Sequence, residues 1–130
     1  ISHPTGIRSV IEAAANFAQG RIVAVFKPYR FTMIHYLRNE YRTAFEGADL
    51  AVLTKTYTAG EVPMEGMDDS FLVDRIRAGG TEVVYVPEME DIAPSLMELM
   101  HDGDTVIFFG GDDLFQVADR FAEGLKEGRA

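Results

Sequence analysis

The sequence predicts an α/β domain built on a doubly wound, mainly parallel sheet with helices on both faces. Two features carry this prediction. Short apolar segments alternate with segments of helical periodicity along the chain, which is typical of parallel strands joined by helical crossovers. In addition, residues 22–26 are apolar at every position, and strands without polar alternation belong in a sheet that is covered on both sides.

The first predicted element is a helix ahead of that strand. Its apolar residues recur at helical spacing: Ile7, Val10, Ile11, Ala14, Phe17 and Ala18. Pro4 suits a first helical turn, and Gly20 suits the end of the helix. Pro28 then ends the first strand, because proline donates no hydrogen bond to a neighbouring strand.

The later elements keep the same alternation. Strands are predicted at residues 50–53, 83–86 and 105–109. Helices are predicted at residues 32–45, from Asp68 or Asp69 to residue 78, from Asp91 with Pro94 in the first turn, and from residues 112–113 to 125. Together these elements predict a Rossmann-like fold over one domain, residues 1–130.

The order of the strands decides where a ligand is expected. If the first strand is central, with the fourth on one side and the second and third on the other, the topological switch lies between the first and fourth strands. Lys27, Tyr29 and Arg30 then come opposite Gly110, Gly111, Asp112 and Asp113.

Composition excludes several classes of function. The formal net charge of −9 argues against nucleic acid or an anionic membrane surface as a partner. There is no cysteine, and the three histidines have no paired spacing, so we expect no disulfide and no metal site. No segment is typical of a membrane span or a signal peptide, and we expect a cytoplasmic protein.

Three groups of residues are candidates for a site, and each also has a structural interpretation. Lys27 and Arg30 flank Pro28-Tyr29 and suit a carboxylate or phosphate, or they are solvated cations at a strand end. The turn at residues 110–113 is an anion-binding helix start, or a tight turn capped by an aspartate. His3 is a pocket residue, or an exposed histidine without a role.

Ordered motifs along nearly the whole chain resemble the C-terminal domain of the Mur ligases. Residues 3–5, His-Pro-Thr, open a helix as in that family. Residues 26–32 resemble its F-Q-P-H-R-Y-S, and residues 53–61 resemble its L-T-D-V-Y-A-A-G-E. Residues 82–87 and 102–104, followed by the terminal glycine turn, complete the match.

The resemblance implies an ATP-dependent ligase of peptidoglycan synthesis. ATP would phosphorylate the carboxylate of UDP-N-acetylmuramate, and the amine of L-alanine would attack the acyl phosphate. This domain would be the amino-acid-binding lid of a larger chain whose N-terminal and central domains bind ATP, Mg²⁺ and the UDP-sugar. Alone it would be inactive.

The resemblance also implies roles for individual residues. Arg30 would bind the carboxylate of the amino acid, with His3, Tyr29 and Lys27 beside it. The loop with Tyr57, Gly60 and Glu61 would lie near the nucleotide, and Gly110, Gly111 and Asp112 would form the turn before the last helix.

Three departures from the family pattern leave the amine substrate open. Ser2 replaces the first of two histidines, Met33 replaces a second arginine, and Asp112 replaces the last glycine of G-A-G. The alternatives are a ligase that adds a preformed peptide in muropeptide recycling, and a noncatalytic α/β binding domain.

Overall fold

The computed structural model, which describes residues 3–62, 66 and 68–128, is organised around a four-stranded parallel sheet in the order β3-β2-β1-β4. Its strands are β1 (Ile22–Phe26), β2 (Leu50–Leu53), β3 (Val83–Tyr85) and β4 (Thr105–Phe109). The predicted fold class and strand order are confirmed, with β1 between β2 and β4.

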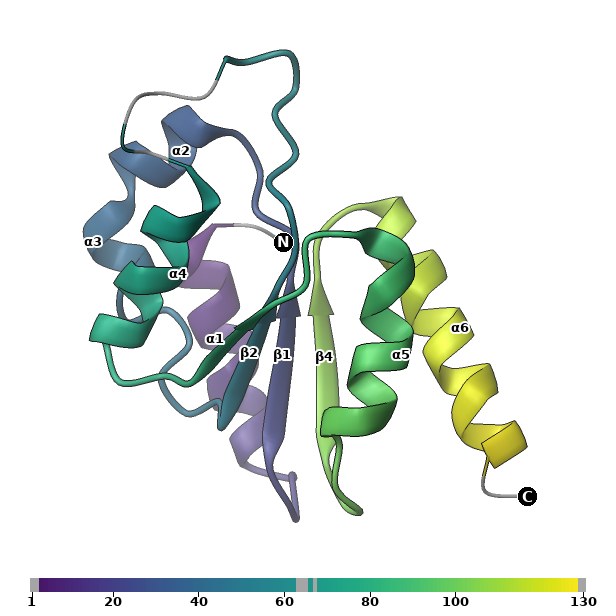
Figure 1. Cartoon of the computed structure of the whole chain (residues 1–130). Coiled ribbons are helices and arrows are strands. Elements are labelled where there is room, and N and C mark those ends of the chain that lie inside the picture. Colours follow the sequence, from purple (N-terminus) through teal and green to yellow (C-terminus); the bar gives the residue numbers. More distant parts are fainter. Residues whose placement is uncertain (1–2, 63–65, 67, 129–130) are drawn as a thin grey trace.

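Helices cover both faces of the sheet. They are α1 (Pro4–Ala15), α2 (Phe31–Tyr36), α3 (Arg38–Tyr41), α4 (Asp69–Ala78), α5 (Met89–Leu99) and α6 (Asp112–Gly128). Figure 1 shows α1 to α4 on one side of the sheet and α5 and α6 on the other. The long helix α6 is amphipathic and buries Leu114, Val117 and Phe121.

The central strand β1 contributes side chains to both hydrophobic cores. Ala24 and Phe26 pack in the core beneath α1 to α4, whereas Val23 and Val25 pack in the core beneath α5 and α6. All residues of β1 are therefore buried, as predicted from the lack of polar alternation.

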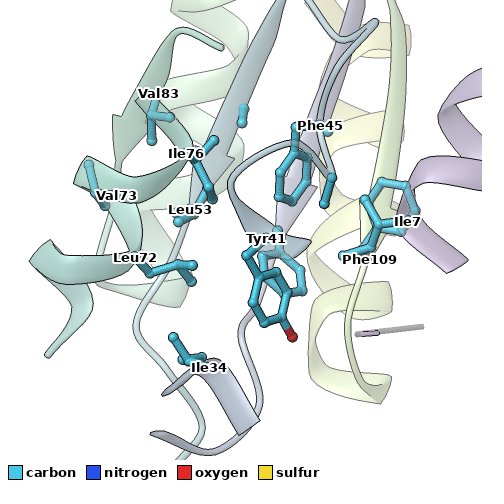
Figure 2. Packing of buried hydrophobic residues seen from close by; sticks show 14 of the residues in the cluster. Ile7, Ile34, Tyr41, Phe45, Leu53, Leu72, Val73, Ile76, Val83 and Phe109 are labelled. Carbon is cyan, nitrogen blue, oxygen red and sulfur yellow. The ribbon is translucent and has the colours of Figure 1, made fainter. Parts of the chain in front are cut away.

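Aromatic packing fixes the carboxyl end of β1, where the candidate site begins. The Phe26 ring lies 5.9 Å from the Tyr41 ring and 5.5 Å from the Phe45 ring, between centroids. Phe45 in turn meets the Phe109 ring edge-on at 6.5 Å. Figure 2 shows Tyr41, Phe45 and Phe109 close together in this core. Such pairs add about 0.5–1.5 kcal/mol each beyond the burial of their area.

The predicted extension of the first helix through Phe17 is wrong. Helix α1 ends at Ala15, and the Phe17 side chain is 70% exposed. The reason is a tight turn that carries the chain to Gly20, beside the loop before β4. A Cβ atom at Gly20 would lie 2.6 Å from the carbonyl oxygen of Gly103, so only glycine allows this approach.

The single helix predicted at residues 32–45 is two short helices. They are separated at Leu37, whose φ of −104° and ψ of 21° leave the helical region. The Arg38 guanidinium donates to the His35 carbonyl at 2.8 Å, so a side chain satisfies a carbonyl at the break.

The helix predicted to start at Asp91 starts earlier, so that prediction is also wrong. Helix α5 begins at Met89 with Glu88 at the N-cap, and the Asp91 N–H donates to the Glu88 carbonyl at 3.0 Å. Asp91 is therefore inside the helix, and Pro94 lies beyond the first turn. Across the described part of the chain, none of the helices combines the length and apolar character that crossing a membrane requires.

Candidate functional site

The loops that follow the strands converge at one edge of the sheet. Phe26, the last residue of β1, is in register with Leu53 of β2 and Phe109 of β4. The backbone N–H of Lys27 donates to the Phe109 carbonyl at 2.9 Å, just past the strand ends. This edge is the place where open parallel sheets bind ligands.

A backbone bridge joins the loop after β1 to the loop after β2. The Tyr57 N–H donates to the Pro28 carbonyl at 2.9 Å, and the Arg30 N–H donates to the Tyr57 carbonyl at 2.8 Å. The rings of Tyr29 and Tyr57 stack with centroids 5.6 Å apart and planes 18° from parallel. Two residues that the sequence assigns to different parts of the site are thus in contact.

One cation lies against each of the two stacked rings. The Arg30 guanidinium carbon is 5.2 Å from the Tyr29 centroid, and the Lys27 Nζ atom is 5.1 Å from the Tyr57 centroid. Both distances are typical of cation–π contacts. Among the described side chains, no carboxylate lies within ion-pair distance of Arg30, so its fork of donors can receive an anion.

Arg30 has a strained backbone. Its φ is 62° and its ψ is 131°, outside the regions that a side-chain-bearing residue normally adopts. Strain of this kind costs about 1–3 kcal/mol and is concentrated at functional sites. Its N–H bond to Tyr57 and its carbonyl, which accepts from the Ile34 N–H at 3.2 Å, hold it in place.

Lys27 forms an ion pair with Asp113, which confirms that these two residues lie opposite each other. The pair lowers the pKa of the Asp113 carboxyl, because the Lys27 ammonium donates to its charged form. A Cβ atom at Gly110 would lie 3.0 Å from the Lys27 Cβ and 2.8 Å from the Leu114 Cδ2, so glycine makes room for the lysine.

The turn before α6 is closed by its own groups. The Gly111 carbonyl accepts from the Leu114 N–H at 3.0 Å, and the Asp113 Oδ1 atom accepts from the same N–H at 2.9 Å. Asp113 is therefore both a turn residue and the partner of Lys27. Asp112 begins the helix, and its side chain lies outside the described part of the structure.

The loop with Gly60 and Glu61 folds back onto the start of α2. Ala59 and Gly60 have φ of 52° and 85°, as in a type I′ turn, and the Glu61 N–H donates to the Thr58 carbonyl. The Glu61 carboxylate then accepts from the Thr32 hydroxyl at 2.5 Å and from the Thr32 N–H at 3.2 Å. The Thr32 hydroxyl is the main cause of the lowered pKa of Glu61.

Asp69 is a second anchor of this loop that the sequence did not reveal. Its Oδ1 atom accepts from the Thr56 hydroxyl at 2.5 Å, and its Oδ2 atom accepts from the Tyr85 hydroxyl at 2.5 Å. Burial, with Asp69 as a further cause, raises the pKa of Tyr85. Asp69 directly follows Asp68, the N-cap of α4. The capping pattern in the sequence predicts a helix start here, but it does not show that Asp69 binds two other segments.

A pocket of about 350 Å³ opens between the loop after β2 and the start of α5. Its lining residues are Lys27, Thr54, Lys55, Thr56, Tyr57, Thr58, Pro87, Glu88, Met89 and Glu90. It joins Lys27, predicted to bind substrate, with Tyr57, predicted to lie near the nucleotide. Charges of both signs line it.

His3 has a structural role in the chain as described. Its Nδ1 atom accepts from the Thr5 N–H at 3.2 Å, which caps α1, and its side chain is exposed. Figure 1 shows the start of α1 at the same end of the sheet as the carboxyl ends of the strands. Ser2 lies outside the described residues. Where side chains are described, no three histidine, aspartate or glutamate groups are arranged to hold a metal ion.

Comparisons with known proteins agree with this architecture. The chain is 40% identical over 126 residues to UDP-N-acetylmuramate–L-alanine ligase of Symbiobacterium thermophilum, and 41% identical over 124 residues to the ligase of the same name from Dichelobacter nodosus. These alignments cover 95% and 93% of this chain and 26% of each relative. The chain thus spans about a quarter of the length of these relatives.

Solved structures show the same fold at lower sequence identity. A UDP-N-acetylmuramate–alanine ligase of Thermotoga maritima matches with a TM-score of 0.73 at 20% identity, over 99% of this chain and 26% of that chain. A murein peptide ligase of Psychrobacter arcticus matches with a TM-score of 0.73 at 17% identity, over 96% and 26%. Because the family model described as "Mur ligase, glutamate ligase domain" matches residues 2–111, this chain belongs to the Mur ligase C-terminal domain family.

Proposed function

We propose that this chain is the amino-acid-binding lid domain of an ATP-dependent ligase that joins L-alanine to UDP-N-acetylmuramate. The names of its relatives support the reaction, and their greater length supports further domains in the same protein. A cytoplasmic location would suit this reaction, because its substrates are nucleotides. The observation that carries the proposal is Arg30, a cation without an ion-pair partner among the described side chains, at the carboxyl edge of the sheet.

Arg30 would bind the carboxylate of the incoming amino acid. A guanidinium can form two parallel hydrogen bonds with a carboxylate, and this geometry orients the amine for attack. Tyr29 lies beside Arg30, and Lys27 lies against Tyr57, the ring that stacks on Tyr29. These side chains would form the wall of the amino-acid site. His3 would contribute from the start of α1.

We infer that ATP and Mg²⁺ bind mainly outside this domain. The sequence has no phosphate-binding loop of the G-x-x-x-x-G-K-[ST] type, and the described side chains include no metal-binding cluster. ATP supplies the activation of the carboxylate in the proposed reaction. We place its site mainly on the preceding domains, with Tyr57, Gly60 and Glu61 approaching it.

The test is a substitution of Arg30 in the protein that carries this domain. We expect Arg30→Ala to raise the KM for the amino acid about tenfold or more, since a charged hydrogen-bonded pair is lost. Arg30→Lys should retain part of the affinity, because it keeps a charge but not the fork. Arg120→Ala, an exposed change on α6, serves as the control.

Two outcomes would contradict the proposal. An unchanged KM in Arg30→Ala would remove Arg30 from the amino-acid site. ATP-dependent amide formation by residues 1–130 alone would show that the domain needs no partner domain. Comparing L-alanine with short peptides as acceptors identifies the amine substrate, which the changes at Ser2 and Met33 leave open.

A further inference from the structure

A continuous row of side chains connects the start of α6 to Arg30. It runs from Asp113 to Lys27 through an ion pair, and from Lys27 to Tyr57 through a cation–π contact at 5.1 Å. It continues from Tyr57 to Tyr29 through ring stacking at 5.6 Å, and from Tyr29 to Arg30 through a second cation–π contact at 5.2 Å. We call these five residues the cation–ring row.

We propose that Asp113 is a positioning residue that fixes the guanidinium of Arg30 through this row. The inference rests on the proposed role of Arg30 as the carboxylate-binding group. Asp113 itself touches no substrate in this arrangement. Its effect passes through Lys27, which holds the Tyr57 ring against the Tyr29 ring.

The exposure of the two rings supports a role beyond packing. Tyr29 is 37% exposed and Tyr57 is 51% exposed, so their stacking lies at the surface and adds little to either core. The backbone bridge between their loops brings the two rings together, and Arg30, whose backbone is strained, lays its own guanidinium over the Tyr29 ring. Side chains held at a surface in this way are preorganised for a ligand rather than buried for stability.

The charges of the row support the same conclusion. Lys27 and Arg30 stand at opposite ends of the stacked ring pair, and Asp113 pairs with the Lys27 end. With the ion pair formed, Lys27 is neutralised and its side chain is only 15% exposed. Arg30 is then left as the cation of the row that an incoming carboxylate meets.

The first test measures the KM of each substrate separately in the protein that carries this domain. We expect Asp113→Asn to raise the KM for the amino acid about 2- to 5-fold, the effect of losing one exposed cation–π contact, with the KM values for ATP and the UDP-sugar unchanged. Asp113→Glu keeps the carboxylate and should restore the wild-type KM. Asp119→Asn, an exposed change on the same helix, is the control.

The second test asks whether the effect passes through Tyr57. In a Tyr57→Leu background the row is already broken, so adding Asp113→Asn should change the KM for the amino acid no further. In a Tyr36→Leu background, a change to an 82% exposed tyrosine outside the row, Asp113→Asn should keep its full effect. An equal effect in both backgrounds would overturn the proposal, as would no effect of Asp113→Asn in the wild-type protein.

A third measurement separates this proposal from the proposed function. In NMR spectra of the 130-residue chain, Asp113→Asn and Lys27→Met should each shift the Arg30 Nε–Hε signal, because that group senses the Tyr29 ring. Unchanged Arg30 signals in variants with otherwise native spectra would contradict the proposal that Asp113 positions Arg30 through the cation–ring row, whatever the enzyme assays show. If the signals shift but Arg30→Ala leaves the amino-acid KM unchanged, the row stands as a structural device and the role of Arg30 in binding is wrong.

Discussion

Arg30 has a strained backbone conformation, and the free-energy cost of this strain can be measured in the folded chain. At a φ of 62°, a Cβ atom meets the neighbouring backbone, whereas glycine has no Cβ atom to clash. The hydrogen bond from the Arg30 N–H to the Tyr57 carbonyl does not depend on the side chain, so it remains when Arg30 is replaced by glycine or by alanine. The order of stability of those variants therefore reports on the strain.

We predict that Arg30→Gly has a free energy of unfolding about 1 kcal/mol higher than that of Arg30→Ala. Urea denaturation of both variants of the 130-residue chain checks this order. The control is Ser9, an exposed position inside α1, where alanine should be the more stable variant by about 1 kcal/mol. If alanine is the more stable variant at both positions, Arg30 is not strained.

At the scale of elements, helix α2 depends on a residue from another loop. No side chain of its own caps its first turn, and the Glu61 carboxylate accepts from the Thr32 N–H and hydroxyl instead. The loop after β2 is thereby attached to the helix that follows Arg30. The predicted nucleotide-proximal loop and the predicted substrate-binding loop form one connected unit.

This connection should be lost at low pH. The pKa of Glu61 lies below its ordinary value of 4.5, so the carboxylate accepts these bonds fully above that pH and releases them as the pH falls through the lowered pKa. We expect the Thr32 amide signal in NMR spectra to stay constant above pH 4.5 and to move below it. Glu61→Ala should remove this titration and speed hydrogen exchange in α2, whereas Glu98→Ala in α5 should do neither. A midpoint at or above 4.5 would contradict the capping role.

The sequence predicts the elements near the site better than their mutual contacts. Pro28 correctly marks the end of β1, and the glycines at 110 and 111 correctly mark the start of α6. The bond between Thr32 and Glu61 and the stacking of Tyr29 on Tyr57 join residues 28 or 29 positions apart. Neither periodicity nor turn composition carries information on such pairs, because each loop pattern is compatible with many partners.

At the scale of the whole molecule, patterning limits the possible orders of the strands to a few, and one of these is observed. A central strand that is apolar on both faces, followed by right-handed crossovers, leaves few arrangements, and the predicted one places Lys27 beside the turn before α6. The errors concern the ends of helices and breaks within them rather than the order of the elements. The break at Leu37 separates the short helices α2 and α3, which local helical periodicity predicts as one element.

A partly buried ion pair between Arg21 and Asp104 connects elements at the end of the sheet opposite the candidate site. The Arg21 guanidinium donates to the two Asp104 oxygens at 3.2 and 2.8 Å and to the Leu99 carbonyl at 2.9 Å. Asp104, which is 1% exposed, also accepts from the His101 N–H at 2.7 Å. Residues next to β1, β4 and the end of α5 therefore meet at one carboxylate, and this junction supports the strands that carry the site at their other ends.

We predict that Asp104→Asn lowers the free energy of unfolding at pH 7 by about 2 kcal/mol, because a charged hydrogen-bonded acceptor is lost from a buried position. Arg21 lowers the pKa of Asp104 below its ordinary value of 3.8. The contribution of the carboxylate is thus complete above pH 3.8 and is lost as the pH falls through the lowered pKa. Chemical denaturation at a series of pH values should show the difference between wild type and Asp104→Asn narrowing only below pH 3.8, with the exposed Asp74→Asn close to wild type throughout. A difference that stays constant into acid would mean that the asparagine loses packing rather than charge.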